Sequence, residues 1–527
     1  MKECLNKYKG HGLWAVLCVL MVHGAKLFSN NIGIDTEDLI HLGSPFYDGW
    51  LNTGRQGLVL LKYLTGSVEY NPYFAQMMTL VMLAVSVLAF VMLWDKVAGA
   101  TGSVNKWVAY GCMFLWISHP VLVEQYYFTL QGVEIGIGVL LTAVALWMVW
   151  MGKAQKGSKK IYAFLLSGML LLLTFSVYQI FVVLFIFGAV TVLLLDTLQK
   201  QESKGTGSAT IVKDVLPYAG VFLGAFICNS VVTSLFFSES DYLSSQVQWG
   251  QLSVRDCVYS IAVHVRDVLT GQNSIFYNVS FGVLCAVGLI AVLCLIKRYG
   301  AVLLFYYVAL MTTPFLMTVV CADEPAVRSQ LLLPAITGFV LYVDVLLIQK
   351  LCVDGFAGTG ASKQSGNKSG SRIAWGIVAL AIISFVGGLS QMQISHRLYY
   401  TDACRYAEDE ALGRALIQQL DPKIGEDDTP IVVIGSHEFQ GNNACLEGEI
   451  IGLSIFEHDV EEEPRYYWST RRVVGFLHTL GYDCEQLPDK NIPYAEEFAV
   501  DMDVWPGKHS VEHAGDMVVI KLSEVNE

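Results

Sequence analysis

The stretch at residues 30–62 brings together the residue types that chemistry at a membrane surface would use. It follows the first long apolar run directly and contains the carboxylates Asp35, Glu37 and Asp38 and the guanidinium of Arg55. A carboxylate can act as a general base on a hydroxyl group that arrives from water, and a guanidinium offers a planar fork of donors to a phosphate. These residue types predict the transfer of a sugar from a lipid phosphate, in which the base activates the acceptor and the cation stabilises the departing phosphate.

A solvated surface loop is the alternative explanation of the same residues. Acidic loops beside a membrane are commonly just hydrated, and Trp50 would then lie at the membrane interface, where indole rings are enriched. The residue types alone leave both explanations open. The elements around the loop decide which side of the membrane it faces.

The composition is that of a membrane protein. The chain has 527 residues, of which 54% are hydrophobic and 15% are charged, whereas soluble domains carry about 25% charged residues. Several stretches of about 20 residues carry almost no charge, which is enough to cross a hydrocarbon core. The formal charge of -13 and the lack of a basic stripe argue against nucleic-acid binding.

We expect a polytopic α-helical membrane protein with about eleven transmembrane helices. The first apolar run follows Lys2, Lys7 and Lys9 without a small-residue cleavage site after it, which predicts an uncleaved anchor. Every second connection is basic, so those connections and the N-terminus are expected to be cytoplasmic, while the loops 30–73 and 238–276 and the tail face outward. The expected helices lie at about 12–29, 74–94, 107–127, 131–151, 161–177, 179–195, 214–237, 277–296, 300–320, 329–349 and 373–391.

Two regions of different character are expected. Residues 1–395 should form the transmembrane domain, with a flexible cytoplasmic linker at 350–372 because that stretch is rich in glycine and serine. Residues 396–527 contain two helix-like stretches and two short runs typical of buried strands, TPIVVIG and GDMVVIKLSE. About 130 residues can bury a core of their own, so we expect a small extracytoplasmic α/β domain.

The tail itself shows no pattern of a second enzyme. Its glycines do not form a nucleotide-binding motif, and Arg471 and Arg472 are expected to lie on a solvated face. Cys445 and Cys484 could pair if the tail faces an oxidising space. No cysteine or histidine group has zinc spacing, and nothing in the sequence requires a metal or another cofactor, although a divalent metal is not excluded.

The run IDTED, Trp50 and the run GRQGL together resemble the bacterial glucosyltransferase II family, whose members carry acids after the first segment and then a Trp-x-x-x-Gly-Arg element. Tyr178 and Gln179, in SVYQ, also resemble a family element and would bind substrate. The resemblance covers roughly residues 12–350. It implies a fold similar to C-type glycosyltransferases, which are multi-span enzymes that use a polyprenyl-phosphate sugar and keep their catalytic acids in the first external loop.

The family roles carry over to individual positions. Asp35 and Glu37 match the acidic motif, Asp38 lies next to them, and Arg55 matches the arginine that would hold the donor phosphate. The chain reads DTED rather than a plain Asp-Asp pair, so the identity of the base stays open. Trp50 would stack on a sugar.

Further candidates lie in other outward loops. Asp323, Glu324 and Arg328 flank a proline and would bind phosphate or acceptor, or else form an ordinary short loop; Arg328 is the strongest because it begins an apolar helix, where an unpaired charge is costly. Glu124 would bind substrate or else be merely solvated. The loop 238–276 contains an amphipathic helix that walls the entrance or only packs.

The sequence thus predicts an inverting glycosyltransferase at the outer face of a bacterial plasma membrane. It would move a sugar, glucose by resemblance, from undecaprenyl phosphate to a cell-surface glycan. One alternative is a polymerase or ligase that moves whole lipid-linked glycans, for which we would expect a larger and more basic external loop. A transporter or flippase is less favoured, because few charges lie near the midplane of the predicted helices and no inverted repeat is evident.

Overall fold

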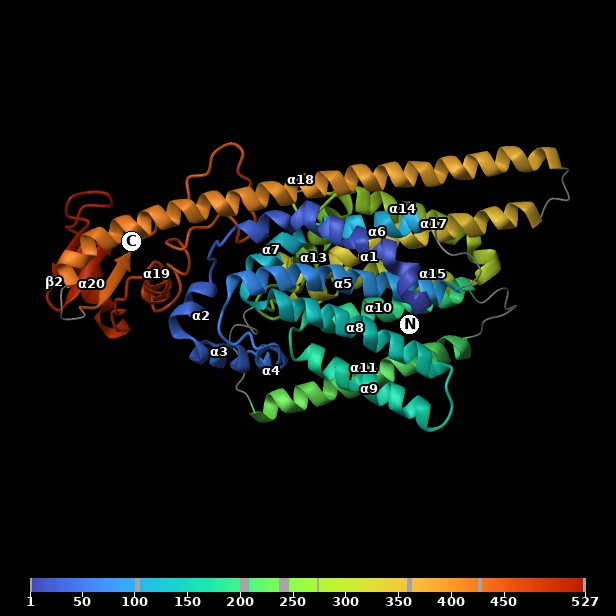
Figure 1. The fold of residues 1–527 in the computed structure, drawn as a ribbon, viewed down its shortest axis with the longest axis horizontal. Helices are drawn as coiled ribbons and strands as arrows, with labels where there is room; N and C mark the ends of the chain where they lie inside the picture. Colours follow the sequence, from blue (N-terminus) through green and yellow to red (C-terminus); the bar gives the residue numbers. More distant parts are fainter. Residues whose placement is uncertain are drawn as a thin grey trace.

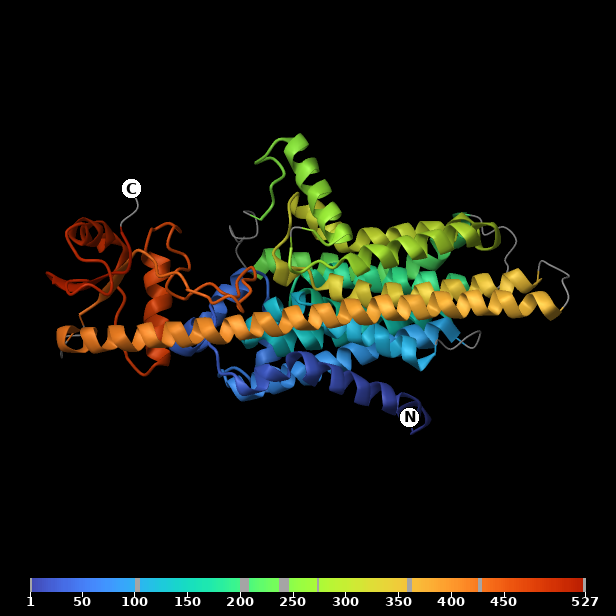
Figure 2. The same ribbon diagram turned by 90° about the horizontal axis from the view of Figure 1, so that it is seen from above.

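The computed structural model describes residues 2–99, 105–199, 208–236, 246–272, 274–357, 363–424 and 429–524. Most of these residues form a bundle of long helices, and a smaller α/β region lies at one end of the bundle (Figures 1 and 2). Ten helical segments in the described part are long and apolar enough to cross a membrane. The prediction of a polytopic helical membrane protein is therefore confirmed.

The ten segments show the usual start and stop signals where these are visible. The second begins at Pro72 after Asn71, whose side chain accepts a hydrogen bond from the backbone of Phe74, and it stops at Gly99, which has φ +69°. The segments are α1 (Lys2–His23), α5 (Pro72–Ala98), α8 (Gly132–Lys153), α9 (Ser158–Phe175), α10 (Ile180–Gln199), α11 (Ser208–Phe236), α14 (Val279–Tyr299), α15 with α16 (Ala301–Thr312 and Leu316–Cys321), α17 (Leu332–Ala357) and α18 (Lys363–Ile424).

The predicted helix at 107–127 is broken in the structure. It consists of α6 (Lys106–Ile117) and α7 (Val121–Tyr127), with the break at Ser118 to Pro120. Proline has no backbone N–H and disfavours a helical residue before it, which ends α6 inside an otherwise apolar run. The eleven expected spans thus correspond to ten long segments and one pair of short helices.

The loop between α1 and α5 folds into three short helices at the end of the bundle that carries the α/β region. They are α2 (Thr36–Leu42), α3 (Tyr47–Asn52) and α4 (Gln56–Thr65). A further helix, α13 (Val254–Thr270), begins at the capping residue Ser253 and ends at Gly271. The amphipathic helix expected within 238–276 is confirmed there; residues 237–245 lie outside the described part.

The last long helix, α18, is one continuous element of 62 residues. At about 1.5 Å per residue it is about 93 Å long, and it runs along the whole bundle into the α/β region (Figure 2). The predicted helix at 373–391 and the first helix of the tail are therefore one helix. Helix also covers most of the expected flexible linker, since α17 ends at Ala357 and α18 begins at Lys363.

Polar contacts hold α18 against the bundle. The hydroxyl of Tyr399 lies 2.7 Å from His23, and Ser118 donates to Gln391 at 3.1 Å. Tyr399 is half-buried and the other three side chains are buried. A buried polar group without a partner is costly, so the contacts specify how α18 is rotated against α1 and the α6–α7 break.

The C-terminal region contains a three-stranded sheet covered by helices. The strand order is β1-β3-β2, with β1 parallel to β3 and β2 antiparallel to it. The two strands expected from the sequence are present, whereas β2 was not expected. The strands are β1 (Ile431–Ile434), β2 (Val511–Ala514) and β3 (Met517–Lys521), and the helices are α19 (Tyr467–Thr479), α20 (Ile492–Ala499) and the end of α18.

A compact apolar core joins these elements. Leu416 of α18, Val433 of β1 and Phe476 of α19 are fully buried in one cluster. Cys445 and Cys484 are both free thiols in the structure, so they form no bond with each other. The core rests on hydrophobic burial rather than on a disulfide.

Candidate active site

The three predicted acids lie at the start of α2. Asp35 precedes the first helical residue and has the left-handed backbone angle φ +68°, while Glu37 and Asp38 occupy the first turn. Negative side chains are favoured in the first turn of a helix. A left-handed conformation is uncommon outside glycine and costs about 1–3 kcal/mol, so the surrounding structure has to impose it on Asp35.

Two arginines of the C-terminal region neutralise these acids. Arg472 of α19 places Nη1 2.9 Å from Oε1 of Glu37 and 3.4 Å from Oδ1 of Asp35, and its Nε bonds to Asp459. Arg471 places Nη2 3.0 Å from Oδ2 of Asp38. The expectation of a solvated arginine face on α19 is therefore wrong: the two arginines join the C-terminal region to the first external loop.

The three acids differ in how far water can reach them. The side chain of Asp35 is 38% exposed, that of Asp38 is 12% exposed and that of Glu37 is fully buried. Burial raises the pKa of Glu37 to about 8, and the positive charge of Arg472 opposes this rise. The second oxygen of Glu37 has no hydrogen-bond partner among the described residues. Asp35 is thus the acid that an incoming hydroxyl group can reach most easily.

Arg55 lies beside Tyr178 and Gln179, the pair of residues that resembles a family element. Its guanidinium lies 5.1 Å from the centre of the Tyr178 ring, and its Nε is buried without a hydrogen-bond partner among the described residues. The side chain of Gln179 donates to the carbonyl of Thr53 at 3.2 Å. The structure therefore brings Arg55, predicted to hold the donor phosphate, together with Tyr178 and Gln179, predicted to bind substrate. Within the described residues, no hydrogen bond or ion pair joins Arg55 to the acids of α2.

Trp50 packs inside the protein. Its ring lies 5.1 Å from Phe46 and 5.4 Å from Tyr47, and the residue is 7% exposed. In this structure the indole packs against the rings of Phe46 and Tyr47 rather than presenting a face to a sugar.

The second predicted outward loop is also bound by the C-terminal region. The carboxylate of Glu449 accepts a hydrogen bond from the backbone of Val327 at 2.7 Å, and burial raises the pKa of Glu449 while the charge of Arg328 opposes the rise. The guanidinium of Arg328 lies 5.0 Å from the Phe128 ring. Glu324 accepts a hydrogen bond from Tyr277 at 2.5 Å.

Glu124 has a structural environment. It is fully buried and accepts hydrogen bonds from the backbone N–H groups of Glu449, at 2.8 Å, and Ile450, at 3.3 Å. A Cβ on Gly448 would lie 1.8 Å from its Oε1, so only glycine allows the loop to approach this closely. Glu124 thus anchors the segment around residues 448–451 and faces protein.

His458 is a candidate that the sequence did not indicate. It is 8% exposed, and its Nε2 is buried without a partner among the described residues. Burial lowers the pKa of His458 to about 3, and the charges of Arg472 and Arg328 lower it further. Burial and the nearby guanidinium charges thus favour the uncharged imidazole. A lone histidine in an acidic tail carries no sequence signal for this position.

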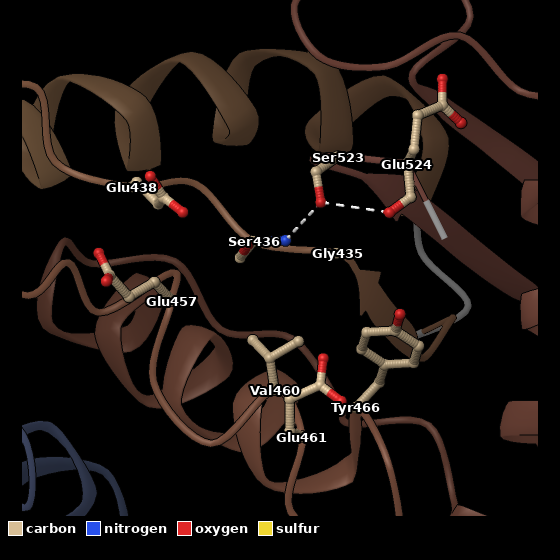
Figure 3. A pocket seen from close by; sticks show the side chains of 9 residues that line it. All are labelled: Gly435, Ser436, Glu438, Glu457, Val460, Glu461, Tyr466, Ser523 and Glu524. Carbon is tan, nitrogen blue, oxygen red and sulfur yellow. Dashed lines mark hydrogen bonds between the residues drawn. The ribbon is translucent and has the colours of Figure 1, made fainter. Parts of the chain in front are cut away.

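A separate pocket lies within the C-terminal region, at the end of β1. Figure 3 shows that glutamates from several segments surround it, and Ser436 donates its backbone N–H to Ser523 at 3.0 Å. Such a concentration of negative charge repels a phosphate. The pocket is lined by Gly435, Ser436, Glu438, Glu457, Val460, Glu461, Tyr466, Ser523 and Glu524. None of the predicted site residues belongs to it, and across the described residues no group of three or more His, Cys, Asp or Glu has the geometry of a metal site.

Comparison with known proteins agrees with the resemblance in the first loop. A family model described as Glucosyl transferase GtrII matches residues 24–348 of this chain. No curated protein and no solved structure matches it. The matched range includes the acids of α2, Arg55 and Arg328, and it ends before the tail that carries Arg471 and Arg472. Since the model covers more than half of the 527 residues, the chain belongs to the GtrII family of glucosyl transferases.

Proposed function

We propose that this glucosyltransferase takes a sugar from undecaprenyl phosphate and transfers it, with inversion, to a cell-surface glycan at the outer face of a bacterial plasma membrane. The proposal includes a C-type glycosyltransferase fold for the helix bundle. One observation carries it: the exposed carboxylate of Asp35 and the unpartnered Nε of Arg55 belong to the same loop at one end of the bundle. Such a loop can meet a water-borne acceptor and a lipid-borne donor together.

The distribution of charge supports the outward orientation. Lys96, Lys153 and Lys297 lie in the last turns of α5, α8 and α14, and these helices end towards the side of the bundle opposite to α2 (Figure 1). Basic connections favour the cytoplasmic side. We therefore assign α2 to α4 and the C-terminal region to the outer side and the N-terminus to the cytoplasm.

The reaction proposed for this site is a single displacement. Asp35 takes the proton of the acceptor hydroxyl as its oxygen forms a bond to the anomeric carbon of the sugar, and the bond from that carbon to the phosphate oxygen breaks. The electron pair leaves with the polyprenyl phosphate, whose negative charge Arg55 stabilises, and the proton passes from Asp35 to water. Attack opposite the leaving phosphate inverts the anomeric centre. Arg328 is a second candidate for the phosphate.

A donor competition tests this function. The purified full-length protein in liposomes is given labelled polyprenyl-phosphate glucose and, separately, a lipid-pyrophosphate oligosaccharide, each with a cell-surface glycan as acceptor. We expect label to move to the glycan only from the monophosphate donor and to carry the inverted linkage. Consumption of only the pyrophosphate donor would instead identify a polymerase or ligase.

A further inference from the structure

We propose that Arg472 is a positioning residue for glucosyl transfer, one that holds the carboxylates of Asp35 and Glu37 in a fixed arrangement from the C-terminal region. This inference rests on the proposed function and deepens it. The active site of the membrane bundle would then be complete only when the C-terminal region is docked. Arg472 touches the acids rather than the reacting atoms, so it acts through them.

The contacts of Arg472 use the guanidinium as a fork. Nη1 reaches Glu37 at 2.9 Å and Asp35 at 3.4 Å, while Nε bonds to Asp459 of its own region. The side chain is 16% exposed. A planar fork with separate donors can keep two carboxylates at set positions, which a single ammonium group cannot do as well.

The backbone around these contacts is held from two sides. On one side, Gly475 of α19 lies against Glu37, where an added Cβ would stand 3.4 Å from the Glu37 side chain. On the other side, Arg405 of α18 donates to the carbonyl of Ile32 at 3.1 Å. The acidic turn is therefore clamped between α18 and α19, which fits the left-handed backbone of Asp35.

The charges around Glu37 explain why one arginine matters. Asp35 and Asp38 face Glu37 from the loop itself and Tyr127 faces it from α7, while Arg472 is the cation against it. Asp459, Glu462 and His458 also interact electrostatically with Arg472. Removal of the Arg472 charge leaves several carboxylates together at a buried position, which disfavours their ionised forms.

The sign of the effect on activity follows directly. A base must be ionised to accept a proton, and the loss of a nearby cation disfavours the ionised form of a carboxylate. Arg472→Gln should therefore move the acid limb of the pH–rate profile to higher pH. Arg472→Lys keeps the charge but loses the fork, so the limb should stay close to that of the wild type while the rate falls.

The experiment measures initial rates of glucosyl transfer from labelled polyprenyl-phosphate glucose between pH 5 and pH 10, in liposomes. For Arg472→Gln we expect the acid limb to shift upward by about 1–3 pH units, with partial recovery of the rate at high pH. For Arg472→Lys we expect at least a fivefold lower rate without that shift. Arg414→Gln, which removes an exposed arginine paired with Glu410, is the matched control.

The outcomes separate this inference from the proposed function. If the wild type transfers no glucose from this donor, the proposed function fails. If the wild type is active and both Arg472 variants keep its rate and its pH profile, only the positioning role is overturned. Should Arg472→Gln not fold, as judged by size-exclusion chromatography, Arg472→Lys decides alone: a wild-type rate contradicts the role of the fork, and a reduced rate with an unshifted limb supports it.

Discussion

At the scale of single residues, Asp35 combines three properties that a catalytic base needs. It is partly exposed, it belongs to the loop that carries Arg55, and its backbone is held in a conformation that few residues adopt freely. Glu37, by contrast, is fully buried. We therefore propose Asp35 as the base, with Glu37 as its buried neighbour.

Asp35→Asn is the sharpest test of that choice. Asparagine has the same shape and tolerates the left-handed backbone, but it cannot take up the proton. We expect the rate of glucosyl transfer to fall by about 10²–10⁴-fold, the usual contribution of a general base, while the affinity for the labelled donor stays within twofold. Glu410→Gln, at an exposed position, is the control. A rate within threefold of the wild type would exclude Asp35 as the base.

Arg55→Lys tests the phosphate contact. Lysine keeps the positive charge but cannot present two parallel donors. Loss of a charge-assisted hydrogen bond costs about 1.5–3 kcal/mol, so we expect the KM for the polyprenyl-phosphate donor to rise by at least about tenfold. Arg255→Lys, on the exposed face of α13, should leave KM unchanged. An unchanged KM in Arg55→Lys would show that another cation holds the phosphate.

The sequence identified the site residues that lie within short motifs. The contact between Arg55 and Tyr178 involves two short motifs that flank neighbouring helices, and motif resemblance was enough to identify both. The ion pair of Glu37 with Arg472 spans 435 positions. No periodicity or composition specifies such a pairing, because it depends on how the C-terminal region docks.

At the scale of elements, glycine and proline decide the geometry around the site. Pro120 divides an apolar run into α6 and α7, which hydropathy averaged over a window of about 20 residues cannot detect. The Gly/Ser-rich stretch led to the opposite difference. Its composition favours a flexible linker, whereas the chain is helical from Lys363 onward.

Gly448→Ala tests how closely the C-terminal loop packs on α7. The new methyl group would overlap the Glu124 carboxylate, so the loop has to move and lose the hydrogen bonds to the backbone of Glu449 and Ile450. Overpacking of this kind costs about 1–3 kcal/mol, and we expect a lower Tm in a thermal unfolding assay of the purified protein. Gly49→Ala meets no atom within 4 Å and serves as the control. Equal Tm values for the two variants would contradict the close packing.

At the scale of the whole molecule, the helix bundle and the C-terminal region meet at a junction made of polar contacts. Arg471 and Arg472 bind the acidic loop, Glu449 binds the loop of Arg328, and Arg405 binds the carbonyl of Ile32. The family match ends at residue 348, so the arginines that complete this junction lie outside it. Their role had to come from the three-dimensional structure.

A single alanine inserted after Tyr406 in α18 tests the junction as a whole. One extra residue rotates the rest of the helix by about 100° and advances it by about 1.5 Å, which moves α19 away from α2. We expect normal membrane insertion and loss of at least about 90% of the transfer rate, in line with loss of the positioned acids. One alanine inserted after Gly441, in an exposed loop, should be tolerated far better. Equal activity of the two insertions would show that docking is not required.

The unbroken course of α18 has a mechanical consequence. A helix that contacts the bundle at Gln391 and Tyr399 and the segment before α2 at Arg405 joins the two regions without a break. A shift or rotation of α18 where it packs on the bundle would therefore also move Arg405 and the backbone of Ile32, which lies three residues before Asp35.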